Sequence, residues 1–148
     1  KESSAASDVY KRQRQSTAAR LGSRPLARVV AHATHAQAPE WFTTAPVAAT
    51  RKLLDQAGWQ VADVDLWEIN EAFAVVPMAL MHDLDVPHDR VNVHGGACAL
   101  GHPIGASGAR IVVTLLHALR ARGGRRGVAT LCIGGGEAVA MAFELLDA

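Results

Sequence analysis

The sequence predicts an α/β domain in which helices pack on a mixed sheet of about five strands, in the order βαβαβαββ. Short apolar runs rich in β-branched residues alternate with longer segments of helical periodicity. Glycines stand where two of those helices should end, at Gly58 and Gly123. The last two runs are joined only by Gly134 to Gly136, so they should pair antiparallel and make the sheet mixed.

The first half of the domain begins with a strand, predicted over Leu26 to Ala33. A helix should follow, with Thr44 as its N-cap residue, Pro46 in its first turn and Gly58 at its C-terminus. The run from Val64 to Ile69 alternates apolar residues over the length of a strand.

The second half begins with a segment, Glu71 to Leu84, that is apolar nearly all round and predicts a buried helix. Pro77 lies inside it, so its first turn should be irregular or kinked. The stretch "RVNVHG", Arg90 to Gly95, predicts a short strand, and Gly105 to Arg122 predicts an amphipathic helix. The two closing strands are "GVATLCI" and "AVAMAFELL", which span residues 127–133 and 138–146.

Length and composition indicate one soluble globular domain, since the chain has 148 residues, 49% of them hydrophobic and 20% charged. A net charge of +1 argues against nucleic acid or a membrane surface as a partner. No apolar run approaches the roughly 20 residues of a membrane helix, and no signal-peptide pattern is visible. Two cysteines, Cys98 and Cys132, are too few for a disulfide framework, so we expect a reduced, cytoplasmic setting.

The first twenty residues differ from the rest because they are polar and lack an apolar period. Within them "DVYKRQ", Asp8 to Gln13, matches the translated end sequence of a transposon used to prepare sequencing libraries. We therefore expect residues 1–20 to be a non-native or disordered tail that arose by adaptor read-through, and the domain to span 21–148. The alternative is a natural, solvated tail.

Three polar or reactive residues fall at predicted strand ends, where open α/β sheets usually bind ligands: Asn70, His102 and Cys132. The glycines after Cys132 would leave main-chain N–H groups exposed, and such groups can hold the oxyanion of a thioester or enolate. His102 stands between a glycine and a proline, and an imidazole can exchange protons near neutral pH.

Each of these residues also has a structural interpretation. Cys132 could be an inert buried hydrophobe, His102 a solvated loop residue, and Asn70 the N-cap of the helix starting at Glu71. Cys98 has no flanking polar group, and the other histidines show no metal-ligand spacing with the cysteines. Nucleotide binding is disfavoured because "GHPIGASGAR" lacks both the P-loop ending and the G-x-G-x-x-G spacing.

Three blocks in order resemble the C-terminal domain of the thiolases: "NEAFA" at 70–74, "NVHGGACALGHPIGASGAR" at 92–110 and "LCIGGG" at 131–136. "RPLARVV" and "APVAATRKLL" also resemble the family's preceding segments, so the likeness runs from about Leu21 to the end. The details are most similar to acetyl-CoA acetyltransferases. The chain departs from many thiolases in having Glu137 and Ala138 after its glycines, and Pro77 after "NEAFA".

The resemblance implies a role for each matching position. His102 would activate a nucleophilic thiol and help hold a thioester oxygen, and Cys132 would be the acid/base that removes and returns the α-proton. Asn70 would fix a water in the first oxyanion hole, and Gly134 would contribute a backbone N–H to the second. Phe73 resembles a residue that lines the pantetheine channel.

The implied activity is that of an acyl-CoA C-acyltransferase, in particular an acetyl-CoA C-acetyltransferase. It would condense two acetyl-CoA molecules, or cleave acetoacetyl-CoA with CoA, through an acyl-cysteine. That nucleophilic cysteine belongs to the family's N-terminal domain, which we expect to be missing here, so this chain alone should be inactive. Acyl-CoA and CoA would be substrates, with no metal or other cofactor, and the full-length protein a homodimer or homotetramer. The alternatives are a broad-chain 3-ketoacyl-CoA thiolase of fatty-acid β-oxidation and a non-catalytic thiolase-like binding domain.

Overall fold

A four-stranded mixed sheet forms the centre of the molecule, which a computed structural model describes over residues 13–146. The strand order is β1-β4-β3-β2, with bounds Ala27–Ala36 for β1, Glu137–Leu145 for β4, Arg126–Cys132 for β3 and Leu66–Ile69 for β2. β4 runs antiparallel to both β1 and β3, whereas β2 and β3 are parallel. The α/β class and the mixed sheet are therefore confirmed.

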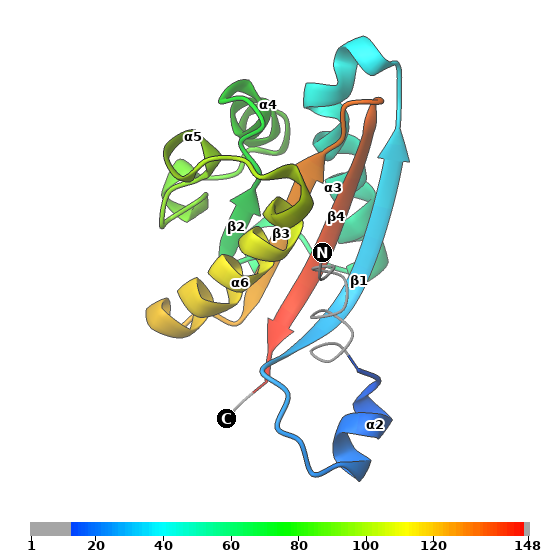
Figure 1. Cartoon of the computed structure of the whole chain (residues 1–148), viewed down its shortest axis with the longest axis vertical. Coiled ribbons are helices and arrows are strands. Elements are labelled where there is room, and N and C mark those ends of the chain that lie inside the picture. Colours follow the sequence, from blue (N-terminus) through cyan, green and yellow to red (C-terminus); the bar gives the residue numbers. More distant parts are fainter. Residues whose placement is uncertain (1–12, 147–148) are drawn as a thin grey trace.

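Helices cover both faces of the sheet (Figure 1). α6 (Ile104–Arg122) lies on one face, against β2 and β3. α3 (Ala45–Ala57) lies on the other, against β1 and β4, and α4 (Val75–Leu84) packs beside it. Alternating strand residues supply both cores: Leu66 packs under α6, whereas Trp67 and Ile69 pack on the side of α3 and α4. The domain thus has three layers: α6, the sheet, and the pair of helices α3 and α4.

The strand predicted over Arg90 to Gly95 is wrong, and the sheet has four strands instead of five. A 3-10 turn, η3 (His88–Arg90), and further turns occupy this segment, and only Val91 forms a single bridge, to Trp67. The physical reason is Asn92, whose φ of 46° lies in the left-handed region and ends any extended conformation. β1 is also longer than predicted, reaching Ala36, because β4 pairs with it over its whole length.

The helix predicted from Glu71 begins instead at Val75, with Ala74 and not Asn70 in the N-cap position. Pro77 is thereby the third residue of α4, where its missing N–H would have had no intrahelical acceptor. The helix therefore begins four residues later than predicted, and Pro77 falls in its first turn.

The other two main helices agree with their predicted limits. α3 ends at Gly58 and α6 at Gly123, both in the left-handed conformation that favours glycine. Thr44 does occupy the N-cap position of α3, but its hydroxyl donates to the Trp41 carbonyl instead of capping the helix.

Near the N-terminus, Gln15–Arg20 form a short helix, α2, that lies below the sheet in Figure 1. The adaptor-like stretch Asp8 to Gln13 lies outside the described residues except for Gln13. Three short elements complete the description: η1 (Pro39–Thr44), η2 (Val61–Asp63) and α5 (Ala97–Leu100). Within residues 13–146, no helix is long and apolar enough to cross a membrane.

A buried carboxylate on β2 makes stability depend on pH. Glu68 is 1% exposed and accepts a 3.2 Å hydrogen bond from Arg110 of α6, while its Oε1 has no partner among the described residues. Burial raises the pKa of Glu68 from its ordinary 4.5 to about 7, although Arg110 opposes the shift. Between these values the native carboxyl keeps a proton that the unfolded chain releases, so stability falls as pH rises.

Because of Glu68, we expect the free energy of unfolding to fall by up to about 3 kcal/mol as the pH rises from about 4.5 to 7. Glu68→Gln should remove that part of the slope, because glutamine does not titrate. Urea denaturation of both proteins across pH 4 to 8 measures the difference. Parallel stability–pH curves for the two proteins would contradict the assignment.

Candidate active site

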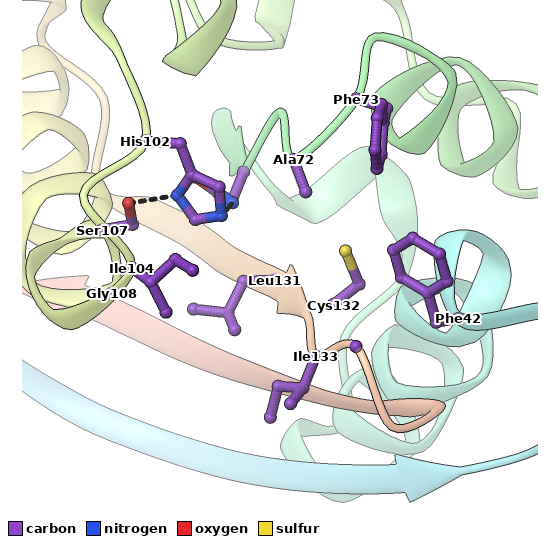
Figure 2. Close-up of a pocket in the computed structure, with 12 residues that line it drawn as sticks. Phe42, Ala72, Phe73, His102, Ile104, Ser107, Gly108, Leu131, Cys132 and Ile133 are labelled. Carbon is purple, nitrogen blue, oxygen red and sulfur yellow. Dashed lines mark hydrogen bonds between the residues drawn. The ribbon is translucent and has the colours of Figure 1, made fainter. Parts of the chain in front are cut away.

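A pocket with a cavity volume of about 420 Å³ opens at the carboxyl ends of the parallel strands β2 and β3 (Figure 2). Parallel pairing brings these ends to one edge of the sheet, and the Asn70 N–H bonds the Thr130 carbonyl at 2.9 Å. The pocket is lined mainly by apolar side chains, with a few polar groups among them: Phe42, Asn70, Ala72, Phe73, His102, Ile104, Ser107, Gly108, Leu131, Cys132, Ile133 and Gly134. All five residues predicted for the site lie in this one lining.

Cys132 is the last residue of β3, and its sulfur points into the pocket (Figure 2). The residue is 8% exposed and belongs to the core cluster formed with α3 and α4. Burial raises the pKa of its thiol above the ordinary value, with a smaller opposing effect from its own backbone N–H. The group is therefore a protonated thiol at neutral pH, able to give a proton and, once ionised, to act as a strong base.

His102 faces the same hollow from the loop that precedes α6 (Figure 2). Its Nδ1 lies 2.5 Å from the Ser107 Oγ, and its Nε2 lies 3.5 Å from the Asn70 Nδ2. Ser107 in turn donates to the Pro103 carbonyl at 3.2 Å. These contacts are satisfied together when Nδ1 carries the proton and Nε2 accepts, which leaves Nε2 as a base directed at the pocket.

Asn70 follows β2 directly and is 1% exposed. Its Nδ2 faces His102, while its Oδ1 is buried without a hydrogen-bond partner among the described residues. A buried amide oxygen of this kind requires a donor, and a water or a ligand group in the pocket can supply one. Asn70 thus lies in the pocket lining and does not cap α4.

The turn between β3 and β4 exposes backbone N–H groups beside the thiol. Gly134 lines the pocket, and its N–H makes no hydrogen bond to another described residue. Gly136 closes the turn, since its N–H bonds the Ile133 carbonyl at 3.1 Å and its φ is 99°. The unpaired N–H of Gly134 next to Cys132 can stabilise a developing oxyanion.

Two aromatic rings form one side of the pocket. Phe73 is 60% exposed and meets Phe42 edge to face, with ring centroids 6.1 Å apart. Sequence reasoning identified Phe73 but missed Phe42, which lies in η1, and Ser107, the polar partner of His102. No pattern marked Phe42, whereas Ser107 could have been noticed as a polar residue in the first turn of the helix after His102.

Two other residues singled out from the sequence lie outside this pocket. Cys98 is exposed and lines a separate hollow, and its backbone N–H donates to Glu71. Ala138 is fully buried in β4, paired with Cys132 across the strands, so its methyl group packs in the sheet. The part of the chain that the structure describes holds no cluster of three or more His, Cys, Asp or Glu side chains suited to a metal ion.

Fold and pocket together define an α/β domain with a thiol, an imidazole and a backbone N–H in the lining of one cavity. The family model for the thiolase C-terminal domain matches residues 23–145, and the chain belongs to the thiolase family. Its sequence is 54% identical over 124 residues to the acetyl-CoA acetyltransferase of Chromobacterium violaceum, covering 84% of this chain and 32% of that protein.

Two further relatives agree. The acetyl-CoA acetyltransferase of Escherichia coli is 53% identical over 133 residues, covering 90% of this chain and 34% of that protein. The crystal structure of the Bacillus anthracis acetyl-CoA acetyltransferase superposes with a TM-score of 0.86 at 44% identity, covering 89% of this chain and 34% of that one. The chain therefore spans about a third of the length of these relatives.

Proposed function

We propose that this domain supplies the acid–base half of an acetyl-CoA C-acetyltransferase site, in a protein whose nucleophilic cysteine lies on a preceding domain. The observation that carries this proposal is the shared pocket lining of Asn70, His102, Cys132 and Gly134. The relatives named acetyl-CoA acetyltransferase, which are 54% and 53% identical to this chain, support acetyl-CoA as the substrate. A non-catalytic binding domain would not need all four groups.

In the proposed condensation, the His102 Nε2 accepts the proton of the upstream thiol, which then takes the acetyl group from one acetyl-CoA and releases CoA. The CoA thiolate, once released, takes the proton of the Cys132 thiol. The resulting Cys132 thiolate removes an α-proton from the second acetyl-CoA, and the Gly134 N–H holds the enolate oxygen. The enolate carbon attacks the acyl-cysteine, forming the new C–C bond and returning the upstream thiolate. The first oxyanion is held beside His102 by a water that the unpaired Asn70 Oδ1 would orient.

The raised pKa of Cys132 fits this role, because a basic thiolate is needed to remove a weakly acidic α-proton. The chemistry uses only these side chains and CoA thioesters, with no further cofactor. The aromatic pair Phe42 and Phe73 would contact the pantetheine arm. We further propose a cytoplasmic homo-oligomer acting in lipid metabolism, in line with the mouse relative named as cytosolic.

Joining the N-terminal two thirds of the Escherichia coli relative to residues 23–145 of this chain tests the proposal. We expect the chimera to cleave acetoacetyl-CoA with CoA, and residues 13–146 alone to show no turnover. A chimera that folds and assembles as its parent does but releases no acetyl-CoA would contradict the proposal. Faster cleavage of longer 3-ketoacyl-CoA substrates would assign the broad-chain alternative instead.

A further inference from the structure

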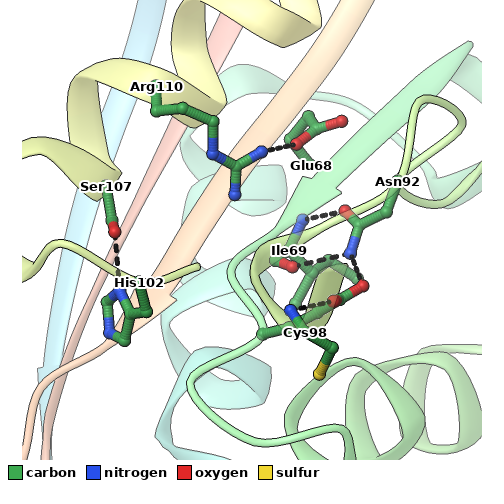
Figure 3. Close-up of polar contacts among 8 residues, drawn as sticks. Glu68, Ile69, Asn92, Cys98, His102, Ser107 and Arg110 are labelled. Carbon is green, nitrogen blue, oxygen red and sulfur yellow. Dashed lines mark hydrogen bonds and ion pairs between the residues drawn. The ribbon is translucent and has the colours of Figure 1, made fainter. Parts of the chain in front are cut away.

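The loop from Asn92 to His102 carries the imidazole of the site, and within the described residues only the Asn92 N–H pairs its backbone with a strand. It leaves the end of η3, passes through α5 and reaches His102 just before α6. The position of His102 relative to Asn70 therefore depends on side chains that attach the loop to β2. Two side chains do so: Asn92, which Figure 3 labels, and Glu71.

Asn92 takes the place of a neighbouring strand at the end of β2. Its Oδ1 accepts from the Ile69 N–H at 2.8 Å, and its Nδ2 donates to the Ile69 carbonyl at 2.9 Å. Its own N–H bonds the Trp67 carbonyl at 2.9 Å. The loop is thus attached through the residue that immediately precedes Asn70.

Glu71, on the other side of Asn70, holds two points of the loop, Asn92 and Cys98, with one carboxylate. Its Oε1 accepts from the Asn92 Nδ2 at 2.8 Å, and its Oε2 accepts from the Cys98 N–H at 2.9 Å. Gly96 lies flat against the carboxylate, since a Cβ there would be 2.2 Å from the Glu71 Cδ. The close approach explains why this position is glycine.

Both carboxylate oxygens must accept for this arrangement to hold. Burial raises the pKa of Glu71, but the Cys98 N–H and the Asn92 amide outweigh it and lower the pKa overall. Glu71 is therefore ionised at neutral pH, when each of its oxygens can take one donor.

We propose that Glu71, bridging Asn92 and the Cys98 N–H, is a positioning residue that holds the 92–102 loop so that His102 keeps Nε2 toward Asn70. The catalytic meaning of this inference rests on the proposed function. The contacts of Glu71 with the loop are independent of that function. The Glu71 side chain is not part of the pocket lining, and its carboxylate bonds Asn92 and the Cys98 N–H, so it acts on His102 through the loop.

The test uses the 15N-labelled chain and needs no turnover. In the unaltered protein at pH 8 the imidazole nitrogen shifts of His102 should report the tautomer protonated at Nδ1. Glu71→Gln keeps the shape of the side chain but replaces one accepting carboxylate oxygen by an NH2 group. That group would face a donor, either the Asn92 Nδ2 or the Cys98 N–H. We expect the population protonated at Nε2 to rise, and amide hydrogen exchange over residues 92–102 to accelerate by on the order of tenfold or more, with β3 unchanged.

Glu68→Gln is the matched control, because it makes the same substitution in a buried side chain on β2 that does not touch the loop. It should leave the tautomer and the loop exchange as they are. Gly96→Ala displaces the same carboxylate from the loop side and should reproduce the effect of Glu71→Gln, which keeps the test open should that variant not fold. Unchanged His102 shifts and loop exchange in a folded Glu71 or Gly96 variant would overturn the inference, whatever the chimera's activity.

Discussion

Replacing Cys132 by serine in the active chimera is expected to slow condensation by about 10²–10⁴-fold or more. Serine fills nearly the same space at the end of β3, so the pocket lined by His102 and Gly134 should persist. Its hydroxyl ionises far less readily than even the raised thiol, and the α-proton then has no competent acceptor. The loss is therefore one of proton transfer and not of binding.

Separating the two half-reactions distinguishes this role from a structural one. Transfer of the acetyl group from acetyl-CoA to the upstream cysteine, followed by CoA release, should be nearly unaffected in Cys132→Ser, since His102 serves that step. Exchange of the α-hydrogens of acetyl-CoA with solvent deuterium should be lost. An equal loss in both measurements would instead indicate a collapsed pocket, and unchanged exchange would remove Cys132 from the mechanism.

The largest expected effect on stability comes from Gly136→Ala, at about 3 kcal/mol of unfolding free energy. Gly136 has a φ of 99°, which a residue with a side chain rarely adopts. A Cβ there would lie 2.2 Å from the Gln37 carbonyl oxygen and 3.2 Å from the Pro39 Cα. These are backbone atoms that cannot rotate away, and Gln37 is itself bonded to the Gly136 carbonyl at 3.0 Å. Urea denaturation followed by tryptophan fluorescence measures the loss.

Gly134→Ala provides the comparison two residues earlier in the same turn. A Cβ at Gly134 would meet nothing within 4 Å, so its unfolding free energy should change by no more than about 0.5 kcal/mol. Similar losses in the two variants would show that the turn depends on glycine in general and not on the contact with Gln37.

Particular elements explain why the fold was largely predictable. The left-handed caps at Gly58 and Gly123 end α3 and α6 where the sequence places them, because only a residue without a Cβ enters that conformation cheaply. The segment at Arg90 to Gly95 was misjudged, because its alternating valines suggest a strand while Asn92 satisfies the β2 backbone with its side chain. The alternation of apolar residues along the sequence could not reveal that a side chain, and not a strand, bonds the backbone at the end of β2.

The sequence by itself determined the α/β class, the mixed sheet and the strand ends at which Asn70 and Cys132 stand. These follow from periodicity and from glycine, which act over a few neighbouring residues. Only the tertiary structure decided that Phe42 faces Phe73 and that Ser107 bonds His102. The same is true of Glu71, which holds the 92–102 loop that carries His102. Such contacts join segments far apart along the chain, and they exist only once the parallel pairing of β2 with β3 has brought both strand ends to one edge.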